Sequence, residues 1–417
     1  MTKSDRPFVE LNGIAYRRPV KPVVVVCIDG GDPLYTEAGV ADGVLPTIGR
    51  YMTDGFSTLA NGVVPSFTNP NNLSIVTGAP PAVHGISGNF FLDPETGDEV
   101  MMNDPRWLTA ETLFAAFSRA GARVAVVTAK DKLRRLLGHG MTGGICFSSE
   151  QADRCTRDEH GIEDALGLVG WDLPDVYSAE LSLFAMEAGI RLLERERFDL
   201  MYLSLTDYIQ HKHAPGSPEA NDFYRRLDDA IGRLEACGAV IGLIADHGMS
   251  DKADADGQPN VIYLQDRLDA RFGAGAAKVI LPITDPYVVH HGALGGFARI
   301  YATDAVTVEA LITFTHGLPG VAAVFDKATA CKTFELPPER EGDVVVVSEG
   351  GTALGGAAAD HDLTGLEGHR LRSHGGMVEA WVPFILSRPL NETYRARAAA
   401  GGIRSYEIFD YAVNGTV

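Results

Sequence analysis

The chain has 417 residues, 45% of them apolar and 22% charged, which is typical of a globular protein with a large buried core. A formal net charge of −19 at pH 7 argues against nucleic acid or an anionic membrane surface as a partner. No apolar run is long enough for a membrane span, and the N-terminal segment has no signal-peptide pattern, so we expect neither membrane insertion nor secretion. The five cysteines form no CxxC pair, which favours a reducing compartment and predicts a cytoplasmic protein.

Short runs rich in β-branched or other apolar residues predict buried strands at 23–28, 123–128, 199–205 and 239–245. Helical patterns lie between these runs at 110–120, 178–196 and 218–236. Strands and helices that alternate at this spacing predict an α/β fold, with a parallel sheet and helices on both of its faces. Ligands of such sheets bind beyond the carboxyl ends of the strands. Asp29, Asp207 and Asp246 each follow a predicted strand and are therefore expected at one edge of the sheet.

The pattern changes after Ser250, where a polar, turn-rich segment precedes irregular short strands with glycine-rich spacers. We interpret 251–370 as a smaller inserted domain, a cap, and 1–250 together with 371–417 as the catalytic core. The core resumes at the apolar run WVPFIL. Whether the insertion closes over a site stays open.

Two sequence patterns offer metal ligands at strand ends. Asp246 and His247 end a predicted strand, and zinc accepts both carboxylate oxygen and imidazole nitrogen. A turn with a surface histidine is the alternative. Asp207 and His211 are four residues apart, so one helical turn would place them on the same face. The alternative here is an aspartate cap followed by a solvated histidine.

His374 lies in the glycine-flanked sequence SHGG, which suits a ligand on a closely packed loop; an incidental histidine in a turn is the alternative. His290 and His291 compete for this role but have no carboxylate at helical spacing, so we rank them lower. His213 is six residues from Asp207 and leaves the shared helix face, which indicates a bystander.

The sequence PSFTNPNN contains two candidate nucleophiles. Pro70 suits the first turn of a helix, which places Thr68 at or near the N-cap. Capping is the common role of a threonine at that position. The functional alternative is a hydroxyl at the positive helix end, where an oxyanion is favoured and a metal could deprotonate it. Ser66 is the rival nucleophile but lies further from the helix start.

Taken in order, the motifs DGGD, FTN, TDxxxH, DHGM and SHGG resemble those of the alkaline phosphatase superfamily. The similarity is greatest to its nucleotide pyrophosphatase/phosphodiesterase-like branch and runs from residue 23 to about residue 386. It implies an alkaline phosphatase-like core and a two-metal hydrolase with Thr68 as the nucleophile. Zinc is the expected metal, although manganese and iron also suit such ligands. The resemblance implies two ligand sets: Asp207, His211 and His374 for one ion, and Asp29, Asp246, His247 and the Thr68 oxygen for the other.

Within this branch the chain is most similar to the phosphonoacetate hydrolase family, which has an asparagine after the nucleophile helix and a Lys-x-Lys after the next strand. These positions are matched by Asn89, Lys130 and Lys132, and the resemblance implies that they bind the substrate. Both lysines follow the strand 123–128, so they project from the same sheet edge as the metal candidates. A solvated helix start is the alternative for such a charge run.

The resemblance implies cleavage of the C–P bond of phosphonoacetate to acetate and phosphate through a phosphothreonine intermediate. The partner would be a small phosphonate, and a homodimer is left open. Three alternatives remain: a phosphodiesterase or phosphomonoesterase with Phe90 and Phe91 as an aromatic slot, a cofactor-independent phosphomutase, and a binding protein that has lost catalysis. The phosphomutases normally use serine, so Thr68 argues against them.

Overall fold

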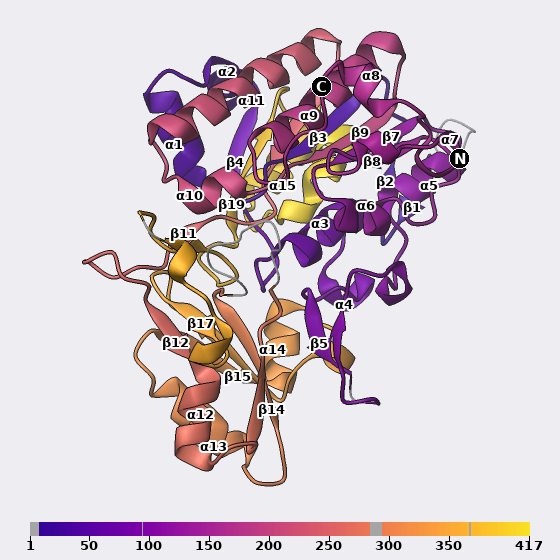
Figure 1. Ribbon diagram of the computed structural model, residues 1–417. Coiled ribbons are helices and arrows are strands. Elements are labelled where there is room, and N and C mark those ends of the chain that lie inside the picture. The colour runs from indigo at the N-terminus through magenta and orange to yellow at the C-terminus, as the bar shows by residue number, and fades with distance from the viewer. Residues whose placement is uncertain (1–7, 94, 284–293, 367) are drawn as a thin grey trace.

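The computed structural model describes residues 8–93, 95–283, 294–366 and 368–417. A large lobe contains a seven-stranded sheet, and a second lobe hangs below it in Figure 1. The strand order of the large sheet is β4 (Phe56–Asn61), β19 (Trp381–Leu386), β10 (Val240–Ile244), β3 (Val23–Cys27), β9 (Leu200–Ser204), β7 (Val124–Thr128) and β8 (Ile145–Ser148). The strands from β10 to β8 are parallel, and β19 is antiparallel to both of its neighbours.

Both faces of this sheet are buried. Successive residues of a strand point to opposite faces, and both sets lie in apolar clusters. Val24 and Val26 belong to one apolar cluster, and Val23 and Val25 belong to the other. Helices that cover the first face include α1 (Pro33–Ala41), α2 (Pro46–Asp54), α8 (Ala165–Val169), α9 (Glu180–Arg195) and α11 (Pro218–Ala236). Helices that cover the second face include α3 (Thr68–Thr77), α5 (Leu113–Arg119), α6 (Asp131–Leu137) and α16 (Ile408–Asp410). The predicted α/β class with helices on both faces is confirmed.

The second lobe is built on a four-stranded antiparallel sheet. Its strands are β13 (Ala277–Ile280), β14 (Phe297–Ala302), β16 (Val344–Ser348) and β15 (Val321–Asp326), in that order. Three helices pack on it: α12 (Leu264–Phe272), α13 (Val308–His316) and α14 (Lys327–Phe334). These helices were not predicted from the sequence, because each is only eight or nine residues long and shows little periodic pattern. The boundaries at 250/251 and 370/371 stay a prediction.

The chain leaves and re-enters the large lobe at one place. β11 (Ser250–Asp251) pairs there with β18 (Arg372–Ser373) in antiparallel register. The lobes also share an apolar cluster, in which Val64 and Phe67 of the large lobe join Phe297 of β14. The loop before helix α3 is therefore packed directly against the second lobe.

A buried ion pair also lies at this contact between the lobes. Arg299 of β14 and Glu341 are both fully buried, and Arg299 Nη2 lies 3.0 Å from Glu341 Oε2. The same guanidinium donates to the carbonyl oxygens of Ser87 and Phe90 at 2.9 and 2.8 Å. These two residues flank the start of β5 (Phe90–Leu92), which pairs with β6 (Glu99–Met101).

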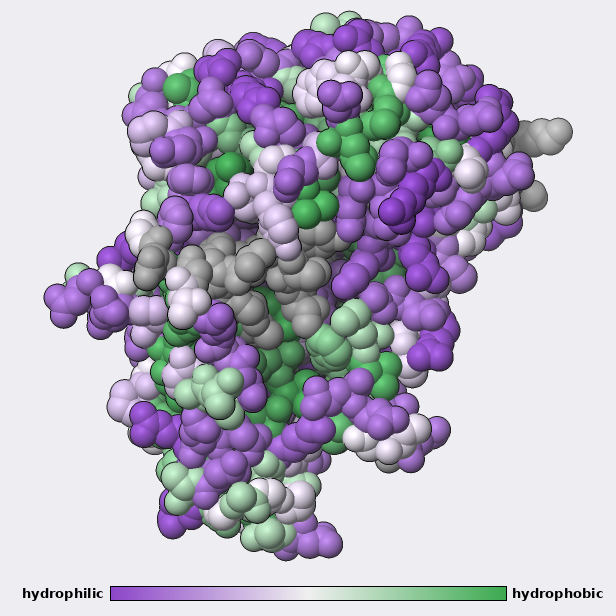
Figure 2. Space-filling model, viewed as in Figure 1, coloured by the Kyte–Doolittle hydropathy of each residue, from purple (hydrophilic) through white to green (hydrophobic). Residues whose placement is uncertain are grey.

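Hydrophilic residues cover most of the face of the large lobe shown in Figure 2. In the described part of the chain, no helix is both long and apolar enough to cross a membrane. All five cysteines are free thiols.

His84, at the end of α4 (Pro81–His84), is fully buried and held in one neutral form. Its Nδ1 accepts a hydrogen bond from Ile86 N at 3.2 Å, so the ring proton lies on Nε2, 2.9 Å from Ser74 Oγ. Burial and the charge of Arg340 lower the pKa of His84 from 6.5 to about 3. The folded protein therefore holds this ring uncharged at neutral pH.

The folded protein should lose stability in acid because of His84. Between pH 6.5 and 3 the unfolded chain takes up a proton that the folded His84 does not, so stability present above pH 6.5 is lost as the pH falls. We expect this group to lower the free energy of unfolding by about 2 kcal/mol from pH 8 to pH 5. Urea unfolding at both pH values should show a smaller decrease for His84→Gln than for wild-type protein. His139→Gln, at an exposed histidine, is the control; equal decreases in all three proteins would contradict the assignment.

Candidate metal centre

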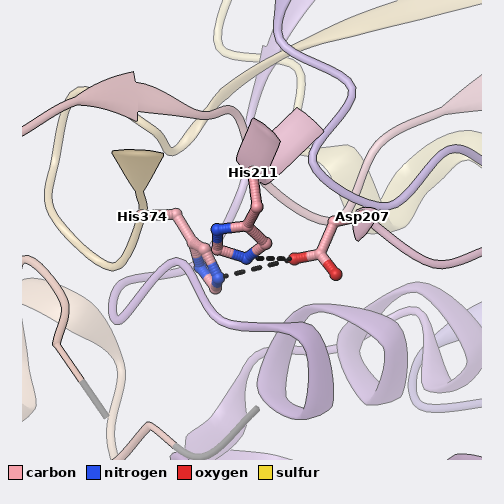
Figure 3. A group of neighbouring side chains, drawn as sticks. All are labelled: Asp207, His211 and His374. Atoms are coloured by element: carbon pink, nitrogen blue, oxygen red, sulfur yellow. Dashed lines mark ion pairs between the residues drawn. The ribbon is translucent and has the colours of Figure 1, made fainter. Parts of the chain in front are cut away.

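Six of the residues selected from the sequence gather in two groups of three. One group is Asp207, His211 and His374, and the other is Asp29, Asp246 and His247. Within each group the ligand atoms lie within 4.8 Å of one another. All six side chains are buried. Figure 3 shows the first group, in which both histidines point toward the Asp207 carboxylate.

The topology of the sheet explains why distant residues meet here. Asp246, Asp29 and Asp207 follow β10, β3 and β9, which are adjacent parallel strands. Their carboxyl ends therefore lie at one edge of the sheet. His374 arrives from the loop between β18 and β19, and β19 is the other neighbour of β10.

Helix α10 (Tyr208–Lys212) brings His211 to this edge. Asp207 occupies the N-cap of α10 but makes no side-chain capping hydrogen bond. His211 lies one turn later, with its Nε2 2.9 Å from Asp207 Oδ2. The capping interpretation of Asp207 is therefore wrong, and the predicted convergence on one helix face is confirmed.

The three histidines are oriented by backbone carbonyls. In each ring Nδ1 faces a carbonyl oxygen, which can only accept, so the ring proton belongs on Nδ1. The carbonyl partners of His211, His247 and His374 are Arg372, Gly248 and Ser66, at 2.8, 2.9 and 2.8 Å. A ring held in this way presents its Nε2 toward the carboxylates, as in histidines that bind metal ions.

The donor set also fits a cation because it contains buried polar atoms that make no hydrogen bond. Among the described residues, Asp29 Oδ1, Asp207 Oδ2 and His374 Nε2 have no hydrogen-bond partner. Leaving such atoms buried without a partner is costly, whereas a metal ion would bind them. Three imidazole nitrogens and three aspartate oxygens suit zinc and related divalent ions.

The charges of the two groups differ. Burial alone would raise the pKa of Asp207, but the charges of Lys130 and His211 hold this pKa well below its ordinary value. Burial and the neighbouring Asp29 raise the pKa of Asp246 well above its ordinary value. Burial alone would lower the pKa of His247, but Asp246 and Asp29 raise it to about 10. The second group is therefore short of positive charge, which a bound cation would supply.

Two further contacts orient Asp246, and the sequence analysis missed both. Asn72 Nδ2 donates to Asp246 Oδ2 at 3.0 Å, while Asn72 Oδ1 accepts from Tyr202 at 2.7 Å and from Ser204 at 3.1 Å. Gly30 N donates to Asp246 Oδ1 at 3.3 Å. Gly30 has a φ of +66°, and a Cβ there would lie 3.0 Å from the Asp207 Cβ, so this turn requires glycine. The sequence offered one hint of the role of Asn72, since it is the second asparagine of PNN in the motif of Thr68.

Thr68 is the first residue of α3, and its hydroxyl faces the metal candidates. Phe67 is the N-cap residue and has no side-chain capping bond, so Thr68 does not cap the helix. Thr68 Oγ1 lies 3.3 Å from His247 Nε2. Ser66, the rival nucleophile, is fully buried; its Oγ donates to Gly376 O at 2.8 Å and accepts from Gly375 N at 3.0 Å. The hydroxyl of Ser66 is thus engaged in holding the loop of His374.

The predicted substrate residues occupy different environments. Lys130 is buried, and its Nζ lies 3.3 Å from Asp29 Oδ2 and 3.2 Å from Asp207 Oδ1, so its charge bridges the two groups. Lys132 is exposed and makes no ion pair with any residue that the structure describes. Asn89 is half-buried, and its backbone N–H donates to Pro282 O at 2.9 Å. The substrate-binding roles of all three residues stay predictions.

The remaining histidines can be placed in part. His213 lies outside both groups, and its Nδ1 is 3.6 Å from Glu219. His290 and His291 fall outside the described residues.

Comparison with known proteins identifies the same architecture. The sequence profile of the type I phosphodiesterase / nucleotide pyrophosphatase family matches residues 23–376. Crystal structures of phosphonoacetate hydrolase from Sinorhizobium meliloti 1021, in complex with phosphonoacetate and with phosphonoformate, are 50% identical to this chain. Each covers 98% of this chain, is itself covered to 99%, and has a TM-score of 0.92. The resemblance inferred from the ordered motifs is confirmed.

More distant relatives share parts of the chain or its fold. An uncharacterized pyrophosphatase/phosphodiesterase of Schizosaccharomyces pombe is 27% identical over 252 residues, which are 58% of this chain and 44% of that protein. The chain thus spans less than half the length of this curated relative. Murine ectonucleotide pyrophosphatase/phosphodiesterase 5, solved in complex with AMP, has a TM-score of 0.62 at 17% identity and covers 95% of this chain and 96% of its own. This likeness concerns the fold alone.

The two groups should each hold one divalent ion. After dialysis against a zinc buffer, elemental analysis of wild-type protein should give about two ions per chain, and His374→Ala should retain about one, because three protein ligands are the usual minimum of such a site. His213→Ala, which changes a neighbouring histidine outside both groups, should keep both ions. An unchanged metal content in His374→Ala would contradict the assignment of this ligand.

Proposed function

This chain belongs to the type I phosphodiesterase / nucleotide pyrophosphatase family, and from that premise we propose that it hydrolyses the C–P bond of phosphonoacetate. The products are acetate and phosphate. The proposal is supported by the 50% identity, over nearly the whole chain, to a phosphonoacetate hydrolase crystallised with phosphonoacetate. Within this chain, the observation that carries it is the ammonium group of Lys130, which lies between two buried Asp/His groups.

The reaction would proceed in two displacements at phosphorus. In the first, the Thr68 hydroxyl gives its proton to water, and Oγ1 forms a bond to phosphorus while the C–P bond breaks. The electron pair of that bond stays on the methylene carbon, which takes a proton from water and leaves as acetate. In the second, a water oxygen bonds to phosphorus, the bond to Thr68 breaks, and the threonine hydroxyl regains its proton. Phosphate leaves, and the intermediate between the two displacements is phosphothreonine.

Residues of this chain would stabilise the charge that develops. The positive end of helix α3 begins at Thr68 and favours negative charge there. Asn89 would donate its side-chain amide to a phosphoryl oxygen. Lys130 and Lys132 would hold the carboxylate of the substrate. This role would explain why a chain with a net charge of −19 has a locally basic segment here. Ions bound by the two groups would act as Lewis acids and favour the ionised form of a hydroxyl.

Zinc is the ion that we propose for both groups, because imidazole and carboxylate ligands suit it. A cytoplasmic location is supported by the five free thiols. A homodimer stays a prediction.

A phosphodiesterase activity is the second candidate, because the matched family and the relative from Schizosaccharomyces pombe carry that name. It would require a slot for a larger organic group. Phe91, proposed for such a slot, is buried, and its ring centroid lies 5.3 Å from that of Trp107. Phe91 is thus part of the core, whereas Phe90 is half-buried. This arrangement favours the smaller substrate.

Substrate preference should depend on Lys130. We expect wild-type protein with zinc to release phosphate from phosphonoacetate and to act poorly on bis-nitrophenyl phosphate. Loss of a charged hydrogen bond is worth about 1.5–3 kcal/mol, so Lys130→Met should lower kcat/KM for phosphonoacetate by about ten- to a hundredfold. The effect on nitrophenyl phosphate, which has no carboxylate, should be smaller.

Arg135→Met is the matched control, because Arg135 is an exposed cation on the same helix α6 and should leave both rates unchanged. Metal content is measured for each protein, since Lys130 also contacts Asp29 and Asp207. Wild-type kinetics in Lys130→Met would contradict the role in carboxylate binding. Faster turnover of the diester than of phosphonoacetate by wild-type protein would favour the second candidate.

A further inference from the structure

Two antiparallel ladders frame the loops that carry His247 and His374. β10 pairs with β19 on one side of these loops, and β11 pairs with β18 on the other. Between the ladders, residues 245–249 and 374–380 leave regular strand pairing. The distance between the two loops therefore depends on particular contacts across the gap.

Glu379 makes several of these contacts. Its backbone carbonyl accepts a hydrogen bond from Gly248 N at 2.6 Å, in the first loop. Its carboxylate accepts from Gly376 N at 2.9 Å through Oε2, in the second loop. The other oxygen, Oε1, accepts from Lys252 Nζ at 2.7 Å, and Lys252 directly follows β11. One residue thus joins both ligand loops and the strand beyond them.

The ion pair between Lys252 and Glu379 is fully buried on both sides. The backbone of Lys252 is fixed as well, since its N–H donates to Leu371 O at 2.7 Å. Burying two charges is costly, and apolar residues of similar volume often give equal or greater stability. Stability alone therefore does not explain a charged pair here, whereas its location between two ligand loops does.

The two histidines are close enough for small loop movements to matter. The rings of His247 and His374 are stacked, with centroids 3.6 Å apart and planes inclined by 5°, although they belong to different ligand groups. Within the second loop, Gly376 lies close to the Glu379 carboxylate, because a Cβ on Gly376 would be 2.9 Å from Glu379 Oε2.

We propose that Lys252 and Glu379 are positioning residues that hold His247 and His374 at a fixed spacing and so set the affinity for a pair of divalent ions. Neither residue is among the ligands. The inference rests on the proposed two-metal site but not on the identity of the substrate.

Zinc dissociation constants of the full-length protein, measured by competition with a chromophoric chelator, test this inference. Lys252→Met combined with Glu379→Met removes both charges and leaves neither one unpaired. We expect zinc to bind this variant about ten- to a hundredfold more weakly than wild-type protein, the usual effect of losing contacts that orient ligands. Circular dichroism and thermal unfolding verify the fold.

A second variant covers the case in which the double variant does not fold. Glu379→Gln keeps the volume and an oxygen for Lys252 but places an amide N–H₂ opposite Gly376 N, where an acceptor is needed. We expect it to weaken zinc binding by about tenfold. The weaker of the two sites should be the one that includes His374, because Gly376 belongs to that loop.

Arg299→Met combined with Glu341→Met is the matched control, because this ion pair is equally buried but contacts the Ser87–Phe90 loop. Its zinc constants should stay within about twofold of wild type, since it shares no partner with the ligand loops. Zinc constants within twofold of wild type in the folded Lys252/Glu379 variants would overturn the inference, and so would equal weakening by the control.

These zinc dissociation constants are measured without substrate. Wild-type protein that binds two zinc ions but releases no phosphate from phosphonoacetate would contradict the proposed reaction alone.

Discussion

Three carboxylates and three imidazoles are buried together at one edge of the sheet, and their need for positive charge governs the surrounding structure. Burial makes unpaired carboxylates costly, so such a cluster persists only beside cations. Lys130 supplies one charge between Asp29 and Asp207. Burial and the neighbouring Asp29 raise the pKa of Asp246, which belongs to the second group. A chain with a net charge of −19 thus places a buried lysine at the site where we propose that an anionic phosphonate binds.

The scaffold meets this constraint with rigid elements from several parts of the chain. Adjacent parallel strands deliver the three aspartates, and backbone carbonyls orient the three histidines. The loop before α3 serves two purposes: Ser66 O holds His374, and Thr68 begins the helix with its hydroxyl beside His247. The second lobe packs against this loop through Phe297 and Val347, so the loop that leads into Thr68, the proposed nucleophile, is supported from both lobes.

Sequence reasoning could reach the parts of this site that depend on local pattern. Buried apolar strands followed by aspartate, and the four-residue spacing of Asp207 and His211, are visible without a structure. Contacts between distant segments were not visible. No sequence motif singled out Glu379, and its buried pairing with Lys252 arises only when two loops meet at the junction of the lobes. Lys130 and Lys132 are alike in sequence, but the turn into α6 buries one and exposes the other.

Thr68 would carry the phosphoryl group covalently during the proposed reaction. Rapid mixing of zinc-loaded protein with phosphonoacetate, quenching in acid and mass spectrometry of the resulting peptides would show where the phosphoryl group resides during turnover. We predict a phosphorylated peptide with the group on Thr68, formed before phosphate accumulates. Phosphate release without a phosphorylated protein, or a phosphoryl group on Ser66, would contradict the account.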